Sequence, residues 1–241
     1  MELLLGCGAD RARRIEVDGR KDWSELVTLD NNPDHEPDVL WDLTSPEPLP
    51  FADDTFDEIH AYEVLEHIGQ QGDYRTFFRQ FSDYWRVLKA GGVFAGTCPS
   101  YRSRWAWGDP SHTRVLTAGT FVFLSQAQYA QQVGKTRMSD FRSVYHADFE
   151  IAQDDAGRLA VSDDGEDLQF VLVAIKPARR MFDADAEGRT EECAEHDVRA
   201  GAGEARHGRE ADAARTDDGG REPGPELPQH RGGHRQAAKV A

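Results

Sequence analysis

The feature that most constrains this chain is a series of short apolar runs near its start, each closed by a turn or an acidic residue. The first run leads directly into the glycine turn Gly6-Cys7-Gly8, and the second and third end at Asp30 and Asp42. Runs of this length and composition, bounded by turn residues, are typical of buried strands. They fall at residues 1–5, 26–29, 38–41 and 57–62.

The next segment predicts an amphipathic helix followed by a fifth strand. Apolar side chains recur at helical spacing from residue 74 to residue 88, namely Tyr74, Phe77, Phe78, Phe81, Tyr84, Trp85 and Leu88. Asp73 can cap the start of this helix, and Gly91 and Gly92 are expected to end it. The fifth strand is expected at residues 93–98.

Two more strands are expected at residues 149–153 and 168–175, joined by an acidic, glycine-containing segment. Two strands connected in this way are antiparallel to each other. The earlier alternation of strands and helices favours a parallel sheet with helices on both faces. The sequence therefore predicts an α/β fold whose parallel sheet ends in an antiparallel hairpin.

Composition changes sharply near Pro177. Beyond residue 181 the large aliphatic and aromatic residues are only Phe182, Val198, Leu227 and Val240. Such a segment buries too little apolar surface to offset its conformational entropy. We therefore expect one folded domain at residues 1–178 and a disordered low-complexity tail at residues 179–241.

Charge and cysteine content narrow the function classes. The net charge of -16 disfavours nucleic acid as a partner, because a phosphate-binding protein normally presents a basic face. There is no apolar run long enough to span a membrane, so we expect a cytoplasmic protein. The cysteines, three in number and without CxxC spacing, indicate neither a disulfide framework nor a zinc site, and no metal site is expected. The oligomeric state is not indicated.

The glycine turn and the two acids together favour a nucleoside-containing ligand. A carboxylate at Asp30 can accept hydrogen bonds from both hydroxyls of an adenosine ribose. Asp42 can accept from the exocyclic amine of adenine, with Leu43 against the ring. The third glycine of a dinucleotide-binding GxGxxG turn would fall at Arg11, and its absence disfavours a nicotinamide cofactor.

Four segments, taken in order, resemble the motifs of class I S-adenosylmethionine-dependent methyltransferases, in particular their small type 11 domains. Residues 3–8 read Leu-Leu-Leu-Gly-Cys-Gly and resemble the first motif, and the others are residues 48–59, 63–68 and 86–93. The likeness covers about residues 1–100. It implies a Rossmann-like, doubly wound, mostly parallel sheet of seven strands, and S-adenosyl-L-methionine as cofactor.

The resemblance also implies roles for individual residues. The glycine turn would pass beside the methionine part of the cofactor, Asp30 with Asn31 would hold the ribose, and Asp42 with Leu43 would hold the adenine. Glu63 would line the pocket near the reacting centre. The cofactor-binding residues implied are thus Gly6, Cys7, Gly8, Asp30, Asn31, Asp42, Leu43 and Glu63. His67 belongs to the third motif, with a structural role expected.

The chain departs from the family pattern in three places. Leu4 and Leu5 stand where an acidic residue usually precedes the glycine turn, and Asp10 replaces the third glycine. The first strand begins without the leading helix that covers the substrate in many relatives. The changes at the glycine turn concern the affinity for the cofactor, and the missing helix concerns how the substrate is covered.

Contacts with the methyl acceptor are expected from the loop after the fifth strand. Aromatic and charged residues gather there: Tyr101, Arg102, Arg104, Trp105, Trp107, Asp109 and His112. His112 is the candidate general base, the alternative being a packed surface loop with a satisfied histidine. The motifs of amino-group and cytosine C5 nucleic-acid methylases are missing, since Tyr62-Glu63-Val64 follows the fourth strand and Cys98 precedes Pro99.

The sequence thus predicts a methyltransferase that acts on a small molecule, a sugar or a protein, with no membrane partner. Two other functions remain open. One is a nicotinamide-dependent oxidoreductase, and the other is a non-catalytic relative that keeps the fold as a binding module.

Overall fold

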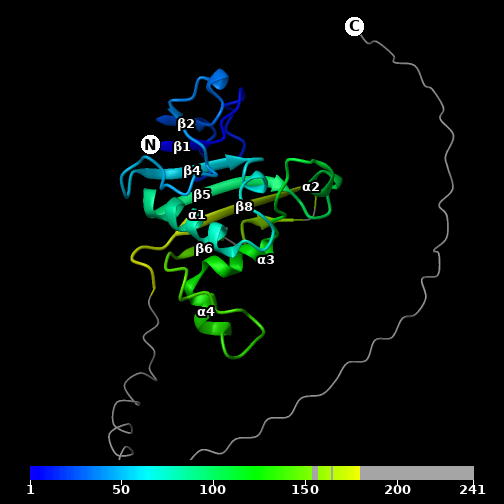
Figure 1. Ribbon diagram of the computed structural model, residues 1–241. Helices are drawn as coiled ribbons and strands as arrows, with labels where there is room; N and C mark the ends of the chain where they lie inside the picture. The colour runs from blue at the N-terminus through cyan, green and yellow to red at the C-terminus, as the bar shows by residue number, and fades with distance from the viewer. Residues whose placement is uncertain (154–156, 164, 180–241) are drawn as a thin grey trace, which may run out of the picture. The chain divides into compact units, whose positions relative to one another are not determined.

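The computed structural model describes residues 1–153, 157–163 and 165–179 (Figure 1). Its strands are β1 (Glu2–Leu5), β2 (Leu26–Asp30), β3 (Val39–Leu40), β4 (Phe56–Tyr62), β5 (Leu88–Pro99), β6 (Phe149–Ile151), β7 (Val161–Ser162) and β8 (Asp167–Ala174). Its α-helices are α1 (Tyr74–Val87), α2 (Arg104–Gly108), α3 (Ala118–Phe121) and α4 (Gln126–Gln132), and its 3-10 helices are η1 (Pro33–His35), η2 (Leu65–His67) and η3 (Val122–Leu124). The predicted tail lies outside the described residues, apart from residue 179.

The strands form one mixed sheet in the order β3-β2-β1-β4-β5-β8-β6, with β7 paired to β8. Strands β1 to β5 run parallel to one another, whereas β8 is antiparallel to both β5 and β6. The predicted Rossmann-like, mostly parallel sheet with an antiparallel C-terminal hairpin is therefore confirmed. The path holds the seven expected strands, and β7 adds a short eighth in the segment expected to connect the last two.

Alternating side chains of the strands divide the core between the two faces of the sheet. Leu3 and Leu5 belong to the larger cluster, with Phe81 of α1 and residues of α3 and α4. Leu4, between them, belongs to a smaller cluster on the opposite face. This period of two follows from the pleat of a strand and fixes which residues of β1 face α1.

Helix α1 confirms the predicted helix but ends earlier than expected. The Asp73 side chain accepts a hydrogen bond from the amide of Thr76, as predicted for the cap. The helix ends at Val87, because the amides of Asp54 and Thr55 take up the carbonyls of Arg86 and Val87 at its last turn. The chain then becomes extended, so Gly91 and Gly92 lie within β5 and do not end the helix.

The second face of the sheet differs from the expected covering of helices. Residues 9–25 lie over it without forming a helix, and Ile15 and Val17 pack on Leu4. A buried polar network on β4 holds this segment. Its members are Glu58, which pairs with Arg13 and Arg20, His60, which contacts Glu58 and Tyr62, and Tyr62, whose hydroxyl accepts from the amides of Arg14 and Ile15.

The topology fixes where a ligand can bind. Strands β1 to β5 place their carboxyl ends at one edge of the sheet, and the arrows of β4 and β5 point toward α2 in Figure 1. The strand order reverses between β1 and β4, and in such sheets the crevice outside this point is the usual ligand site. Within the described ranges, no helix is both long and apolar enough to cross a membrane.

Candidate functional site

A pocket of about 360 Å³ lies at this carboxyl edge, where β1, β2, β3 and β4 end. It is lined by Gly6, Gly8, Asp30, Asn31, His35, Trp41, Asp42, Leu43, Thr44, Glu63, Val64, His67 and Ile68. The structure thus brings together all the predicted cofactor residues except Cys7. The Cys7 side chain is buried on the opposite face with Leu4 and Tyr62, and burial raises the pKa of its thiol.

The glycine turn approaches the pocket with two residues in the left-handed region. Gly6 has φ of 57° and Gly8 has φ of 54°, conformations that an L-residue with a side chain rarely adopts. A Cβ on Gly6 would lie 2.6 Å from Cγ2 of Val64, whereas a Cβ on Gly8 would meet no atom within 4 Å. Gly6 is therefore needed for packing against Val64, and Gly8 leaves open space beside the pocket.

Asp30, at the end of β2, is fixed by the turns around it. Its Oδ2 accepts a hydrogen bond of 2.8 Å from the amide of Gly8, and its Oδ1 accepts one of 2.8 Å from the amide of Asn32. Burial alone would raise the pKa of this carboxyl, but these amides and the neighbouring His35 hold the pKa below its usual value. Asp30 is therefore ionised and rigid at neutral pH, with lone pairs left to accept from a ligand.

Asp42 and Leu43 follow β3 and also line the pocket. The Oδ1 of Asp42 accepts from both the amide and the hydroxyl of Thr44, each at 2.8 Å. These contacts fix an exposed carboxylate in a local turn. Leu43 packs partly on the larger core, so the pair presents an anchored acid beside an apolar surface.

Glu63, directly after β4, has an unusual backbone. Its φ is 56°, in the left-handed region, and its amide donates to the carbonyl of Thr97 at 2.9 Å. A residue other than glycine in this conformation costs about 1–3 kcal/mol, and such residues cluster at functional sites. Burial raises the pKa of Glu63, a contact with Thr97 opposes the rise, and the nearby Asp167 adds to it.

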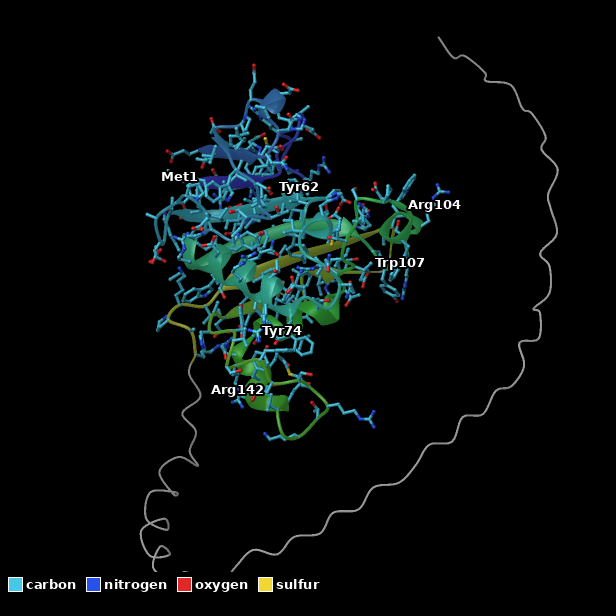
Figure 2. The ribbon with its side chains drawn as sticks, viewed as in Figure 1. Met1, Tyr62, Tyr74, Arg104, Trp107 and Arg142 are labelled. Carbon is cyan, nitrogen blue, oxygen red and sulfur yellow. The ribbon has the colours of Figure 1, made fainter. Side chains whose placement is uncertain are left out.

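A second pocket, of about 310 Å³, adjoins the first and shares Glu63 and His67 with it. It is lined by Glu63, Glu66, His67, Pro99, Ser103, Trp105, Asp109, His112 and Asp167. Of the residues predicted to contact an acceptor, it brings together Trp105, Asp109 and His112. Figure 2 shows Arg104 and Trp107 projecting from the region of α2, and the Trp107 side chain is 71% exposed.

Some lining residues were not singled out from the sequence. His35 places its Nδ1 3.3 Å from Oδ1 of Asp30, and nothing in the local sequence marks it for that position. Trp41 directly precedes Asp42 in the sequence, so the prediction of Asp42 could have indicated Trp41 as a lining residue as well. Glu66 lies inside the third motif, but only the folded chain shows how deeply it is buried.

The comparisons with known proteins agree with the resemblance found in the sequence. Residues 3–96 match the model of the family described as a methyltransferase domain. The match covers the first part of the chain, less than half of its length. The resemblance to class I methyltransferases is thereby confirmed, and every lining residue of the first pocket falls within the matched stretch. The loop that carries Trp105 and His112 lies beyond it.

The chain is also similar to solved structures, at low identity. One is a SAM-dependent methyltransferase from Archaeoglobus fulgidus, 15% identical, with a TM-score of 0.42 over 71% of this chain and 85% of that one. Another is the putative methyltransferase in a complex with the Trm112 activator of Haloferax volcanii, 17% identical, with a TM-score of 0.44 over 74% and 83%. These likenesses carry no argument about substrate or partner. No protein of curated function matches the sequence.

Proposed function

We propose that this protein binds S-adenosyl-L-methionine in the first pocket and transfers its methyl group to a small-molecule, sugar or protein acceptor. The observation that carries the proposal is the convergence of the glycine turn, Asp30, Asp42 and Glu63 on one pocket at the carboxyl edge of the sheet. An open space at Gly8 and an ionised, anchored acid at Asp30 fit a ligand with a ribose and a chain that passes close to the backbone.

The cofactor would supply a methyl group already activated by its sulfonium. The chain's residues therefore have to hold donor and acceptor in line and exclude water, and such positioning contributes about 7–11 kcal/mol to rate enhancement. Asp30 would accept from the ribose hydroxyls, and Asp42 with Leu43 would bind the adenine. The glycine turn would lie along the methionine part, which brings the reacting centre to Glu63.

The second pocket supports an acceptor site beside that centre. It shares Glu63 and His67 with the first pocket, and Trp105 offers an aromatic surface for a planar or apolar group. The net charge of -16 argues against nucleic acid as the acceptor. A general base is needed only for an acceptor that carries a proton at neutral pH, and His112 was the candidate from the sequence.

Binding and turnover test this proposal. Calorimetry of the full chain should show one site for S-adenosylmethionine or S-adenosylhomocysteine, and none for NADH. Labelled S-adenosylmethionine, incubated with the protein and a panel of metabolites and cell-extract proteins, should yield a methylated product identified by mass spectrometry. NADH binding without S-adenosylmethionine binding would favour an oxidoreductase, and cofactor binding with no transfer would favour a non-catalytic binding module.

A further inference from the structure

Three side chains in the second pocket turn metal-binding atoms toward one another. They are Glu66 and His67 of η2, and His112 from the loop after α2. Nε2 of His67 lies 3.8 Å and Nε2 of His112 lies 4.0 Å from Oε1 of Glu66. The three donor atoms all lie within 4.8 Å of one another. Donors around a tetrahedral ion with bonds of about 2.1 Å are separated by about 3.4 Å, so a small side-chain movement would close the cluster on an ion.

The backbone holds the two segments of this cluster together. The amides of Thr113 and Arg114 both donate to the carbonyl of Glu66, at 2.9 and 3.2 Å. The rings of His67 and His112 meet edge to face, with their centroids 4.8 Å apart. The cluster is therefore assembled from segments far apart in the sequence by bonds that do not involve the donor atoms themselves.

Glu66 is the observation that points to a ligand. Its side chain is only 3% exposed, and neither carboxylate oxygen has a hydrogen-bond partner in another described residue. Burying an acid without partners is costly, and nearly all buried polar groups in proteins are paired. A cation between the carboxylate and the two imidazoles would supply the missing partner.

His67 also has the tautomer that a metal ligand requires. Its Nδ1 lies 3.2 Å from the carbonyl oxygen of Ser111, which can only accept, so Nδ1 carries the proton. In the neutral ring Nε2 is then the nitrogen with the free lone pair, and it is the one that lies 3.8 Å from Oε1 of Glu66. Histidine ligands in metal sites are commonly oriented by this same kind of hydrogen bond from the second ring nitrogen.

We propose that Glu66, His67 and His112 bind one divalent transition-metal ion in the second pocket. Two imidazoles and one carboxylate suit zinc, manganese, iron or cobalt better than calcium or magnesium, which prefer oxygen donors. The remaining coordination positions are left to water or to a ligand in the pocket. Oδ2 of Asp109, 4.0 Å from Nε2 of His112, lies at the edge of the cluster.

The assignment changes what the sequence indicated about this region. No metal site was expected, because the cysteines lack the spacing of a zinc site. The sequence pattern does not indicate this cluster, because its ligands are carried by segments 45 residues apart and only Glu66 and His67 are neighbours. His112 becomes a ligand in place of a general base, since a lone pair that binds a metal cannot take up a proton. The site goes beyond the proposed function, and its test needs no S-adenosylmethionine.

The test is a metal titration of the full chain after treatment with a chelator. Zinc and cobalt should each bind, and one equivalent of each ion per chain should be held by Glu66, His67 and His112. The cobalt complex should show visible absorption. In His112→Ala and in Glu66→Gln this equivalent should be lost, or bind at least about 10-fold more weakly. His146→Ala, which changes an exposed histidine lining another pocket, is the matched control and should bind like the wild type.

Glu66→Gln keeps the side-chain volume and replaces the unpartnered carboxyl group with a neutral amide, so it should fold even if His112→Ala does not. Histidines in the part of the chain that the structure does not describe would bind equally in every variant, so only the difference between variants counts. The proposal is overturned if the wild type binds neither ion, or if it binds with the same stoichiometry and affinity as Glu66→Gln. If the wild type binds S-adenosylhomocysteine but no metal, the metal site is refuted and the proposed function is not. If it binds metal through the cluster but no S-adenosylhomocysteine, the proposed function is refuted and the metal site is not.

Discussion

The two glycines of the first turn should respond differently to the same substitution. Gly6→Ala places a methyl group 2.6 Å from Cγ2 of Val64 and also forces alanine to adopt a φ of 57°. The backbone conformation costs about 1–2 kcal/mol, and the overpacking costs about 1–3 kcal/mol more. We therefore expect Gly6→Ala to lower the free energy of unfolding by about 2–5 kcal/mol. Gly8→Ala meets no atom within 4 Å and should cost only the backbone share, about 1–2 kcal/mol.

Urea unfolding followed by far-UV circular dichroism measures both changes. A double-mutant cycle with Val64→Ala isolates the overpacking, because that substitution removes the methyl group that Gly6→Ala would strike. The cycle should show a favourable coupling of about 1–3 kcal/mol for Gly6→Ala and none for Gly8→Ala. Gly8→Ala should instead weaken S-adenosylhomocysteine binding. Equal destabilisation by the two variants, with no coupling to Val64, would refute this account of the turn.

Three further predictions concern the pocket and the second face of the sheet. Asp30→Asn should weaken S-adenosylhomocysteine binding about 10- to 150-fold in calorimetry, through loss of charged hydrogen bonds worth about 1.5–3 kcal/mol, while the exposed Asp34→Asn should leave it unchanged. The folded-state pKa of Asp30 lies below its ordinary 3.8, so its ionised form stabilises the fold above about pH 4 and this effect is lost as the pH falls. The difference in unfolding free energy between the wild type and Asp30→Asn should therefore shrink in acid. A difference that stays constant with pH would contradict this prediction. Tyr62→Phe should cost about 1–3 kcal/mol in urea unfolding, since it leaves the amides of Arg14 and Ile15 without their acceptor, whereas the exposed Tyr101→Phe should change stability by less than about 0.5 kcal/mol.

The elements that were predicted correctly are those with a strong local signal. Strand β1 contains a run of leucines that ends in a glycine turn, and α1 holds six of the seven apolar residues predicted at helical spacing, with Asp73 as its cap. The end of α1 was wrong because it depends on hydrogen bonds from Asp54 and Thr55, which come from another part of the chain. The local sequence of α1 does not show that amides from elsewhere in the chain will bond to its last carbonyls.

The covering of the second face could not be predicted for a similar reason. Residues 9–25 are held by ion pairs to Glu58 and by hydrogen bonds to Tyr62, and both partners lie about forty residues further along the chain. The alternation rule predicted a helix wherever a parallel crossover was needed. The buried network on β4 provides another way to cover that face.

In the candidate site, too, the residues with a sequence signal were predicted and those brought together by distant contacts were not. Asp30 and Asp42 were predicted because each closes a strand, whereas Glu63 was implied by the family resemblance. Parallel strands bring their carboxyl ends to one edge, which places the three acids together. Cys7 was grouped with its glycine neighbours, but the alternation of side chains turns it to the opposite face. The cluster of Glu66, His67 and His112 needed the folded loop, since a hydrogen bond to the carbonyl of Glu66 brings His112 beside it.

A crystal structure of the protein with S-adenosylhomocysteine would test the central claim most directly. The account predicts ribose hydroxyls within hydrogen-bond distance of the Asp30 carboxylate, adenine between Asp42 and Leu43, and the sulfur next to Glu63. Density for the ligand at another edge of the sheet, or a ribose turned away from Asp30, would contradict it.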